Sequence, residues 1–172
     1  SCVVFKNGRP NKKEYRYFNI KTVFGINDFA SIQEVVYRRY KRVLAEKKPL
    51  PNLIVIDGGR GQLSSTINSL KKLGLYKKIS VIGIAKRLDQ IFSTNDPLPF
   101  YLDKKSDSLR LIKNLRDEAH RFAVTAHRKR RNKIALELEE YKIKGVGEKT
   151  IKKLIDEFGS IKIVLDTDKK KL

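Results

Sequence analysis

The sequence contains no methionine, no tryptophan and only one cysteine in 172 residues. A single cysteine excludes an internal disulfide framework and any zinc site built from several cysteines, and it favours a reducing compartment. No stretch approaches the ~18 apolar residues that a membrane span needs, and no secretory leader precedes the first strand-like residues. We therefore expect a soluble, cytoplasmic protein without a membrane partner. The missing methionine further predicts that the chain is a fragment of a longer protein.

Acidic residues are also scarce, because 19 Asp and Glu face 39 Lys and Arg and leave a net charge of +20. Such a surplus repels itself unless an anionic partner binds. The dense basic runs at 38–42 and 127–133 do not lie on one amphipathic helix with a bulky apolar face, as a membrane binder would require. Nucleic acid is therefore favoured. A merely solubilising surface explains the scattered lysines but not the arginine runs.

Apolar periodicity and turn residues predict an α/β domain. The Asn7-Gly8 pair indicates a hairpin turn between strands at 2–6 and 14–20. The uninterrupted apolar run at 53–56 is typical of a central strand covered on both faces. The remaining predicted elements are a helix at 29–47 with Asp28 as its N-cap and Pro49 and Pro51 ending it, a helix containing Leu63, Ile67 and Leu70, a strand at 79–85, an edge hairpin at 90–93 and 98–102, a helix from about 107 to about 133, and short helices around 145–147.

Asp57 ends the apolar strand and is followed by Gly58-Gly59-Arg60-Gly61. Ligands of open α/β sheets bind beyond the carboxyl ends of the strands, so this carboxylate is placed to hold a metal or orient a phosphate. Glycines after it allow a sharp turn and a close approach to a ligand. Two alternatives stay open: Asp57 caps the next helix, or the glycines form a nucleotide cradle. The cradle lacks the third small residue and the later acidic residue of the dinucleotide pattern.

The long helix carries a second group of polar residues beside its apolar face. Arg116, His120 and His127 fall on one flank of that face at 100° per residue. We expect this flank to meet the edge of the sheet, neither buried nor fully exposed. The two histidines lie about 10.5 Å apart along the axis, so they cannot share one metal ion. The alternative for either histidine is a surface residue with a structural hydrogen bond.

Three segments in one order resemble the C-terminal half of UvrC, a family of bacterial excinucleases: Val55–Leu63, Ile82–Arg87 and Arg116–Ala123. Ser1–Phe5 and Tyr37–Tyr40 match as well. The resemblance implies an RNase H-like mixed sheet flanked by helices over residues 1–133, with its first strand missing. A small all-α helix-hairpin-helix segment would follow at 134–172. The family makes the 5′ incision beside damaged DNA during nucleotide excision repair, and a separate GIY-YIG domain makes the 3′ incision.

The resemblance also implies roles for individual residues. Asp57 is similar to the second carboxylate of a Mg²⁺ or Mn²⁺ site, and His120 to the histidine that completes it. Asp28 matches an acidic position implicated in family activity, with the N-cap role as its alternative. Lys86 would end a strand beside Asp57 and face a phosphate. The family's first catalytic aspartate lies in a Phe-Asp-Ile-Ser strand that this sequence does not contain.

DNA contacts are expected along the long helix and beyond it. Gly145 and Gly147 would expose backbone N–H groups to a phosphate, and such contacts read no base sequence. The resemblance implies that UvrA and UvrB present the damaged site. Because one carboxylate is missing, two classes remain: a metal-dependent endonuclease and a non-catalytic, sequence-independent DNA-binding module. The expected DNA-binding residues are Lys86, Arg116, His127, Arg128, Arg130, Arg131, Gly145, Gly147 and Lys149.

Overall fold

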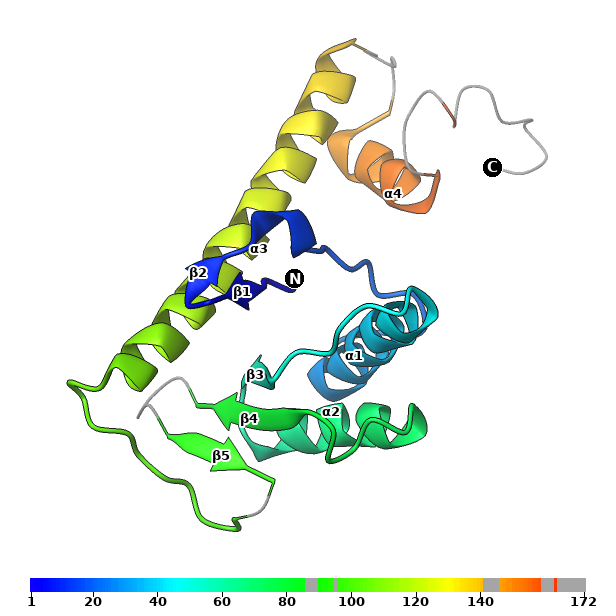
Figure 1. The fold of residues 1–172 in the computed structure, drawn as a ribbon. Helices are drawn as coiled ribbons and strands as arrows, with labels where there is room; N and C mark the ends of the chain where they lie inside the picture. The colour runs from blue at the N-terminus through cyan, green and yellow to red at the C-terminus, as the bar shows by residue number, and fades with distance from the viewer. Residues whose placement is uncertain (86–89, 95, 141–145, 159–162, 164–172) are drawn as a thin grey trace. The chain divides into compact units, whose positions relative to one another are not determined.

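A computed structural model describes residues 1–85, 90–94, 96–140, 146–158 and 163. Contacts divide the chain into two compact units, Ser1–His120 and Arg121–Leu172. Figure 1 shows the described elements in chain order. They are β1 (Phe5–Lys6), β2 (Arg9–Pro10), η1 (Lys12–Glu14), α1 (Asp28–Ala45), β3 (Leu53–Asp57), α2 (Arg60–Lys72), β4 (Ser80–Ile84), β5 (Ile91–Ser93), α3 (Asp107–Glu140) and α4 (Glu148–Phe158).

The N-terminal hairpin forms at the expected turn but with a different second strand. Asn7 and Gly8 have φ angles of 51° and 72°, the positive values that a two-residue hairpin turn requires. This short turn pairs β1 with β2 directly after it, so the prediction of a second strand at 14–20 was wrong. A 3-10 turn, η1, occupies residues 12–14 instead, and only an isolated bridge joins Cys2 to Arg16.

Helix α1 begins one residue earlier than expected and has a different cap. The Asn27 side chain accepts a hydrogen bond from the Ala30 amide at 3.0 Å, so Asn27 is the N-cap and the assignment of Asp28 to that role was wrong. Either side chain type caps a helix well, and sequence alone did not distinguish two adjacent candidates. The helix ends at Ala45, before the prolines, because Lys47 is left-handed at φ 49°. Two hydrogen bonds form a Schellman motif at this end: Lys47 N donates to Leu44 O, and Lys48 N donates to Val43 O.

The segment before α1 is held to that helix by one carboxylate. Glu34 accepts hydrogen bonds from the amides of Lys21 and Thr22, from the Thr22 hydroxyl and from Arg38. Its side chain is only 7% exposed. These bonds, led by that of the Thr22 amide, lower the pKa of Glu34 from its ordinary 4.5 to about 2. The carboxylate therefore stays ionised in the folded protein well into acid.

The main sheet has three described strands in the order β3-β4-β5. Strands β3 and β4 are parallel, with Asp57 opposite Ile84, and β5 is antiparallel to β4. Among the described strands β4 is therefore central, and the prediction that β3 is central was wrong. Leu53 is 41% exposed. An apolar run shows that both faces of a strand are partly covered, but hydrogen-bond pairing decides its place in the sheet.

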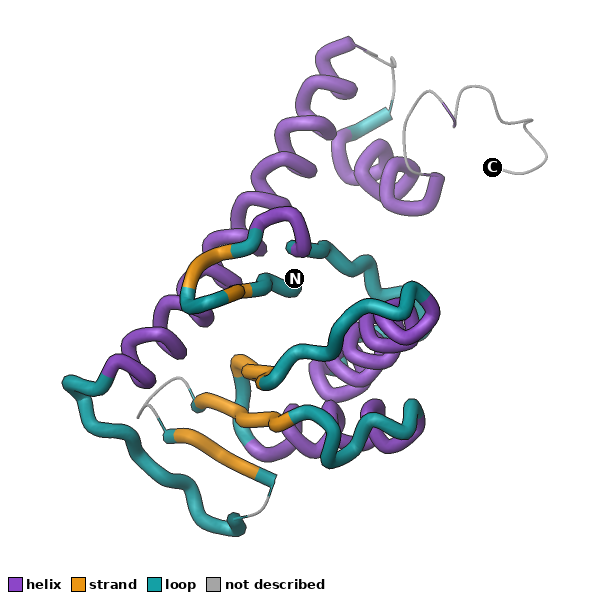
Figure 2. Tube along the Cα trace, viewed as in Figure 1, coloured by secondary structure: helices purple, strands orange, loops and turns teal. Residues whose placement is uncertain are grey.

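Side chains on the two faces of the sheet enter different apolar clusters. Ile54 and Val81 pack with Leu63 and Leu70 of α2 and with Val36 of α1. Helices α1 and α2 also contact each other, and the buried Ser69 hydroxyl donates to Gln33 O at 2.8 Å. Figure 2 shows both helices beside the strands.

On the opposite face, Ile84 and Ile91 pack with Ile112 of α3. This mixed sheet between helices confirms the predicted α/β class with an RNase H-like arrangement. The edge hairpin after β4 is smaller than expected, because residues 98–102 form no strand and only an isolated bridge between Phe100 and Ile91 joins them to β5.

Helix α3 continues to Glu140, past its expected end near 133. The sequence from 134 to 140 is rich in Leu and Glu and has no Gly or Pro to stop a helix. The proposed domain boundary at 133/134 lies within this helix and stays a prediction. In the second unit, α4 buries Ile151 and Ile155, which are one turn apart. Within the described residues, no helix is long and apolar enough to cross a membrane.

Candidate active site

Asp57 is exposed at the carboxyl end of β3, on a tight turn. The amide of Gly58 donates to Ile56 O at 3.0 Å, which makes Asp57 the central residue of a γ-turn. Alternation along β3 places Asp57 on the same side as Val55, the side on which Ile112 of α3 packs. The carboxylate is thus presented at the sheet end, as expected, rather than used as the cap of α2. The N-cap of that helix is Gly59.

Among the glycines after Asp57, close packing requires a glycine at position 61, and unusual backbone angles require none of them. None of Gly58, Gly59 and Gly61 has a positive φ. A side chain at position 61 would collide with the Phe29 ring, and a Cβ atom at position 58 would lie 2.6 Å from Cδ of Gln62. Nothing lies within 4 Å of the corresponding point at Gly59. The backbone at Gly59 is therefore the open approach to the turn.

Phe29 brings the start of α1 to the turn after Asp57. Its ring lies against Gly61, 32 positions later in the chain, and Asp28 precedes it directly. Asp28 is exposed as the first residue of α1. The sequence analysis did not identify Phe29, because no local pattern links residues so far apart.

His120 lies on α3 at the end of the first unit. The neighbouring Ala119 carbonyl accepts a hydrogen bond from the Ser1 hydroxyl at 3.2 Å, which ties the N-terminus to this part of the helix. His120 is exposed, so for this residue the expectation of an intermediate environment was wrong. Arg116, one turn earlier, is partly buried and pairs with Asp117 at 3.3 Å.

Within the described part of the chain, no three or more His, Cys, Asp or Glu side chains form a group that could hold a metal ion. Asp57, His120 and Asp28 therefore do not form a complete set of metal ligands among the described residues. Mg²⁺ usually keeps several waters and takes only one or two protein carboxylates together with substrate phosphates. An exposed carboxylate beside open backbone, as at Asp57, fits that mode of binding.

The expected DNA-binding residues are only partly described. Arg128 is exposed on α3, and Gly147 precedes α4 and accepts hydrogen bonds from Thr150 N and Ile151 N. Lys86 and Gly145 lie outside the described residues. The positions whose backbone alone is described are His127, Arg130, Arg131 and Lys149.

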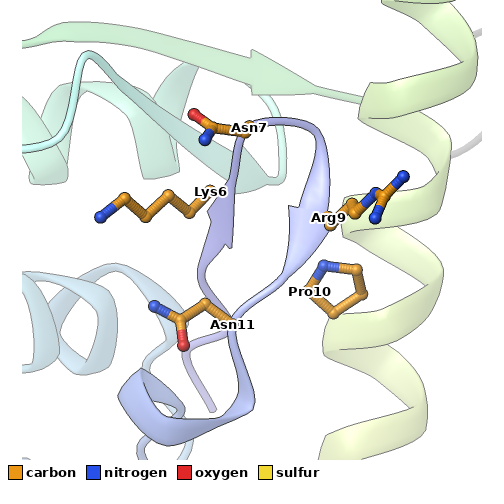
Figure 3. A pocket seen from close by; sticks show the side chains of 5 residues that line it. All are labelled: Lys6, Asn7, Arg9, Pro10 and Asn11. Carbon is orange, nitrogen blue, oxygen red and sulfur yellow. The ribbon is translucent and has the colours of Figure 1, made fainter.

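A hollow of about 530 Å³ lies at the tip of the N-terminal hairpin. Figure 3 shows Lys6 and Arg9 extending away from each other on its two strands. Its other lining residues are Asn7, Pro10 and Asn11. Because the two cations diverge, this hollow does not form a converging anion site.

Residues 1–124 match the model of the UvrC RNase H endonuclease domain. The chain belongs to this UvrC domain family. The resemblance inferred from the three motifs is thereby confirmed, and the matched segment contains Asp28, Asp57 and His120.

Similar UvrC proteins come from several bacteria. The UvrABC system protein C of Christiangramia forsetii is 56% identical over 172 residues, covering 100% of this chain and 29% of the relative. That of Flavobacterium psychrophilum is 59% identical over 162 residues, or 94% of this chain and 27% of the relative. That of Salinibacter ruber is 48% identical and is covered over 28% of its length. The chain thus spans less than a third of the length of these relatives.

Proposed function

We propose that this chain is the endonuclease part of a protein that makes the 5′ incision beside damaged DNA in nucleotide excision repair. The observation that carries the proposal is an exposed aspartate at the carboxyl end of β3, inside a segment matching the UvrC RNase H endonuclease domain. The protein would act in the bacterial cytoplasm and receive the damaged site from UvrA and UvrB, since the relatives are named as part of the UvrABC system.

The proposed chemistry is hydrolysis of one phosphodiester bond. A bound Mg²⁺ or Mn²⁺ would activate water and neutralise charge that develops on the phosphate. Asp57 would hold this ion through its carboxylate oxygens. His120 would accept or relay the proton of the attacking water through an imidazole nitrogen. Asp28 would add a second carboxylate from the start of α1, which Phe29 holds beside the Asp57 turn.

DNA would be held through its phosphates. The net charge of +20 favours a polyanion. Arg128, Arg130 and Arg131 within α3 would contact the DNA backbone, together with Arg116, His127, Lys86 and Lys149. Amides near Gly145 and Gly147 would hold the next phosphates. Such contacts carry no sequence information, as a repair enzyme requires.

A second candidate function is a non-catalytic DNA-binding module. It is favoured by the lack of a three-ligand metal group among the described residues. The two functions differ in what they require of Asp57: the endonuclease needs its carboxylate for incision, whereas a DNA-binding module does not.

The deciding experiment is single-turnover incision of an end-labelled, lesion-containing duplex by the full-length parent protein with UvrA, UvrB and Mg²⁺. Asp57→Asn keeps the shape of the side chain and removes its charge. We expect loss of the 5′ product with the 3′ product retained, whereas Asp103→Asn, which changes an exposed aspartate before α3, leaves both. Normal 5′ incision by Asp57→Asn would overturn the assignment and favour the DNA-binding module.

A further inference from the structure

A groove runs along the outer side of α2 in the first unit. It is an open cavity of about 510 Å³ between this helix and a facing segment made of the end of β5 and the residues that follow it. Both walls present polar groups. The hydrogen-bonding and charged residues that line it include Arg60, Ser64, Asn68 and Lys71 from α2 and Ser93 and Thr94 from the facing segment.

The four α2 residues form one stripe along the groove. They recur at intervals of four, four and three residues, which places them on one face of the helix. Eleven residues separate Arg60 from Lys71, or about 16.5 Å along the axis. A row of this length, with a cation at each end and two neutral hydrogen-bonding groups between them, suits an extended ligand rather than a compact one.

The two cations of the stripe are held by aromatic rings. The guanidinium of Arg60 lies 5.4 Å from the centroid of the Phe92 ring, and Nζ of Lys71 lies 5.0 Å from that of Tyr76. Neither cation has an ion-pair partner in the part of the chain that the structure describes. Both charges are therefore positioned at opposite ends of the groove and available to an anion.

Asp96 is the acidic residue of the lining. Its Oδ1 accepts a hydrogen bond from the Leu98 amide at 2.8 Å, so this carboxylate is used in its own turn. The lining therefore carries two positive charges, on Arg60 and Lys71, and one negative charge, on Asp96.

We propose that the α2 groove binds the sugar–phosphate backbone of one DNA strand as that strand leaves Asp57. The groove begins at Arg60, three residues after Asp57 in the chain. Serine, threonine and asparagine beside Arg and Lys are typical phosphate contacts. This mixture favours DNA over an acidic peptide. The inference rests on the proposed function for its ligand, but it concerns binding and not cleavage.

The test compares Lys71→Ala with Lys72→Ala in the full-length protein. Each variant removes one charge from adjacent exposed positions, but only Lys71 lines the groove. Binding to an undamaged duplex is titrated with salt, without divalent metal so that no cleavage occurs. We expect Lys71→Ala to reduce the slope of log affinity against log salt by about 0.9, and Lys72→Ala to leave it unchanged. Lys71→Arg should restore the slope.

A second measurement locates the DNA. A photo-crosslinker attached at Asn68→Cys, in a full-length protein whose other cysteines, including Cys2, are replaced by serine, should label one strand of lesion-containing DNA near the incision position, and one attached at Lys72→Cys should not. Equal slopes for Lys71→Ala and Lys72→Ala, or labelling of UvrB instead of DNA, would overturn the proposal. Because the assay needs no incision, these outcomes are independent of the Asp57→Asn result.

Discussion

Gly83 on β4 lies directly beside the carbonyl oxygen of Gly58. A Cβ atom at position 83 would approach that oxygen to 2.7 Å, and the obstacle is backbone that cannot rotate away. Packing against β4 thus fixes the position of the turn that follows Asp57. The backbone of the turn after β3 therefore requires a glycine at position 83 of β4.

Gly83→Ala should therefore displace the Asp57 turn. We expect a loss of about 2–3 kcal/mol in the free energy of unfolding, because overpacking against backbone forces the chain to shift. The 5′ incision should fall with it. The control is Gly59→Ala, where the added atom meets open space and only weaker helix capping costs up to about 1 kcal/mol. Chemical denaturation measures both, and equal losses would contradict the packing argument.

His120 should matter for the chemistry and His127 should not. Both lie on α3, about 10.5 Å apart along its axis, so one metal centre cannot use both. Removing a general acid or base typically costs about a hundredfold or more in rate. We expect that loss in single-turnover 5′ incision for His120→Ala on pre-assembled complexes. Comparable large losses for His127→Ala would refute the distinction.

Arg130 and Arg131 should contribute to DNA affinity through release of counterions. Replacing both with Ala should reduce the slope of log affinity against log salt by about 1.8, equivalent to two phosphate contacts. Lys12→Ala with Lys13→Ala removes the same charge from η1 and should leave the slope unchanged. The measurement uses several unrelated duplexes, and a strong preference for one of them would argue against backbone binding.

Glu34 should make the folded state sensitive to acid. Its folded pKa of about 2 lies below the ordinary 4.5, so its stabilisation is complete above about pH 4.5 and is lost as pH falls toward 2. Glu34→Gln should therefore flatten the decline of unfolding free energy in that window. Glu157→Gln removes an exposed carboxylate of α4 and should not.

High salt should distinguish the effect of Glu34 on acid stability from that of Glu46. The pKa of Glu46 is also lowered to about 2, chiefly by the hydrogen bond from Lys48. The Glu46 side chain is 32% exposed and pairs with surface cations, so about 1 M salt should weaken its effect. The Glu34 effect should persist, because backbone amides bind that carboxylate. Equal losses of both effects in salt would show that Glu34 acts only as a surface charge.

Short-range patterns predicted much of the fold. The Asn7-Gly8 turn, the buried stripe of α2 and the acidic end of β3 each depend on a few neighbouring residues, whose backbone preferences and periodicity are visible in the chain. Local patterns were less decisive where neighbours compete, as Asn27 and Asp28 do for one cap. They also placed the end of α3 too early.

Sequence alone therefore determined the class of the domain, its family and the position of Asp57 at a strand end. Tertiary structure decided that β4 and not β3 is central, that Phe29 closes over Gly61, and that Glu34 holds the segment before α1. It also placed the polar stripe of α2 opposite the end of β5 and the residues that follow it. The physical reason is that each of these contacts joins residues far apart in the chain. Their meeting depends on how whole elements pack, whereas propensity and periodicity act only over a few residues.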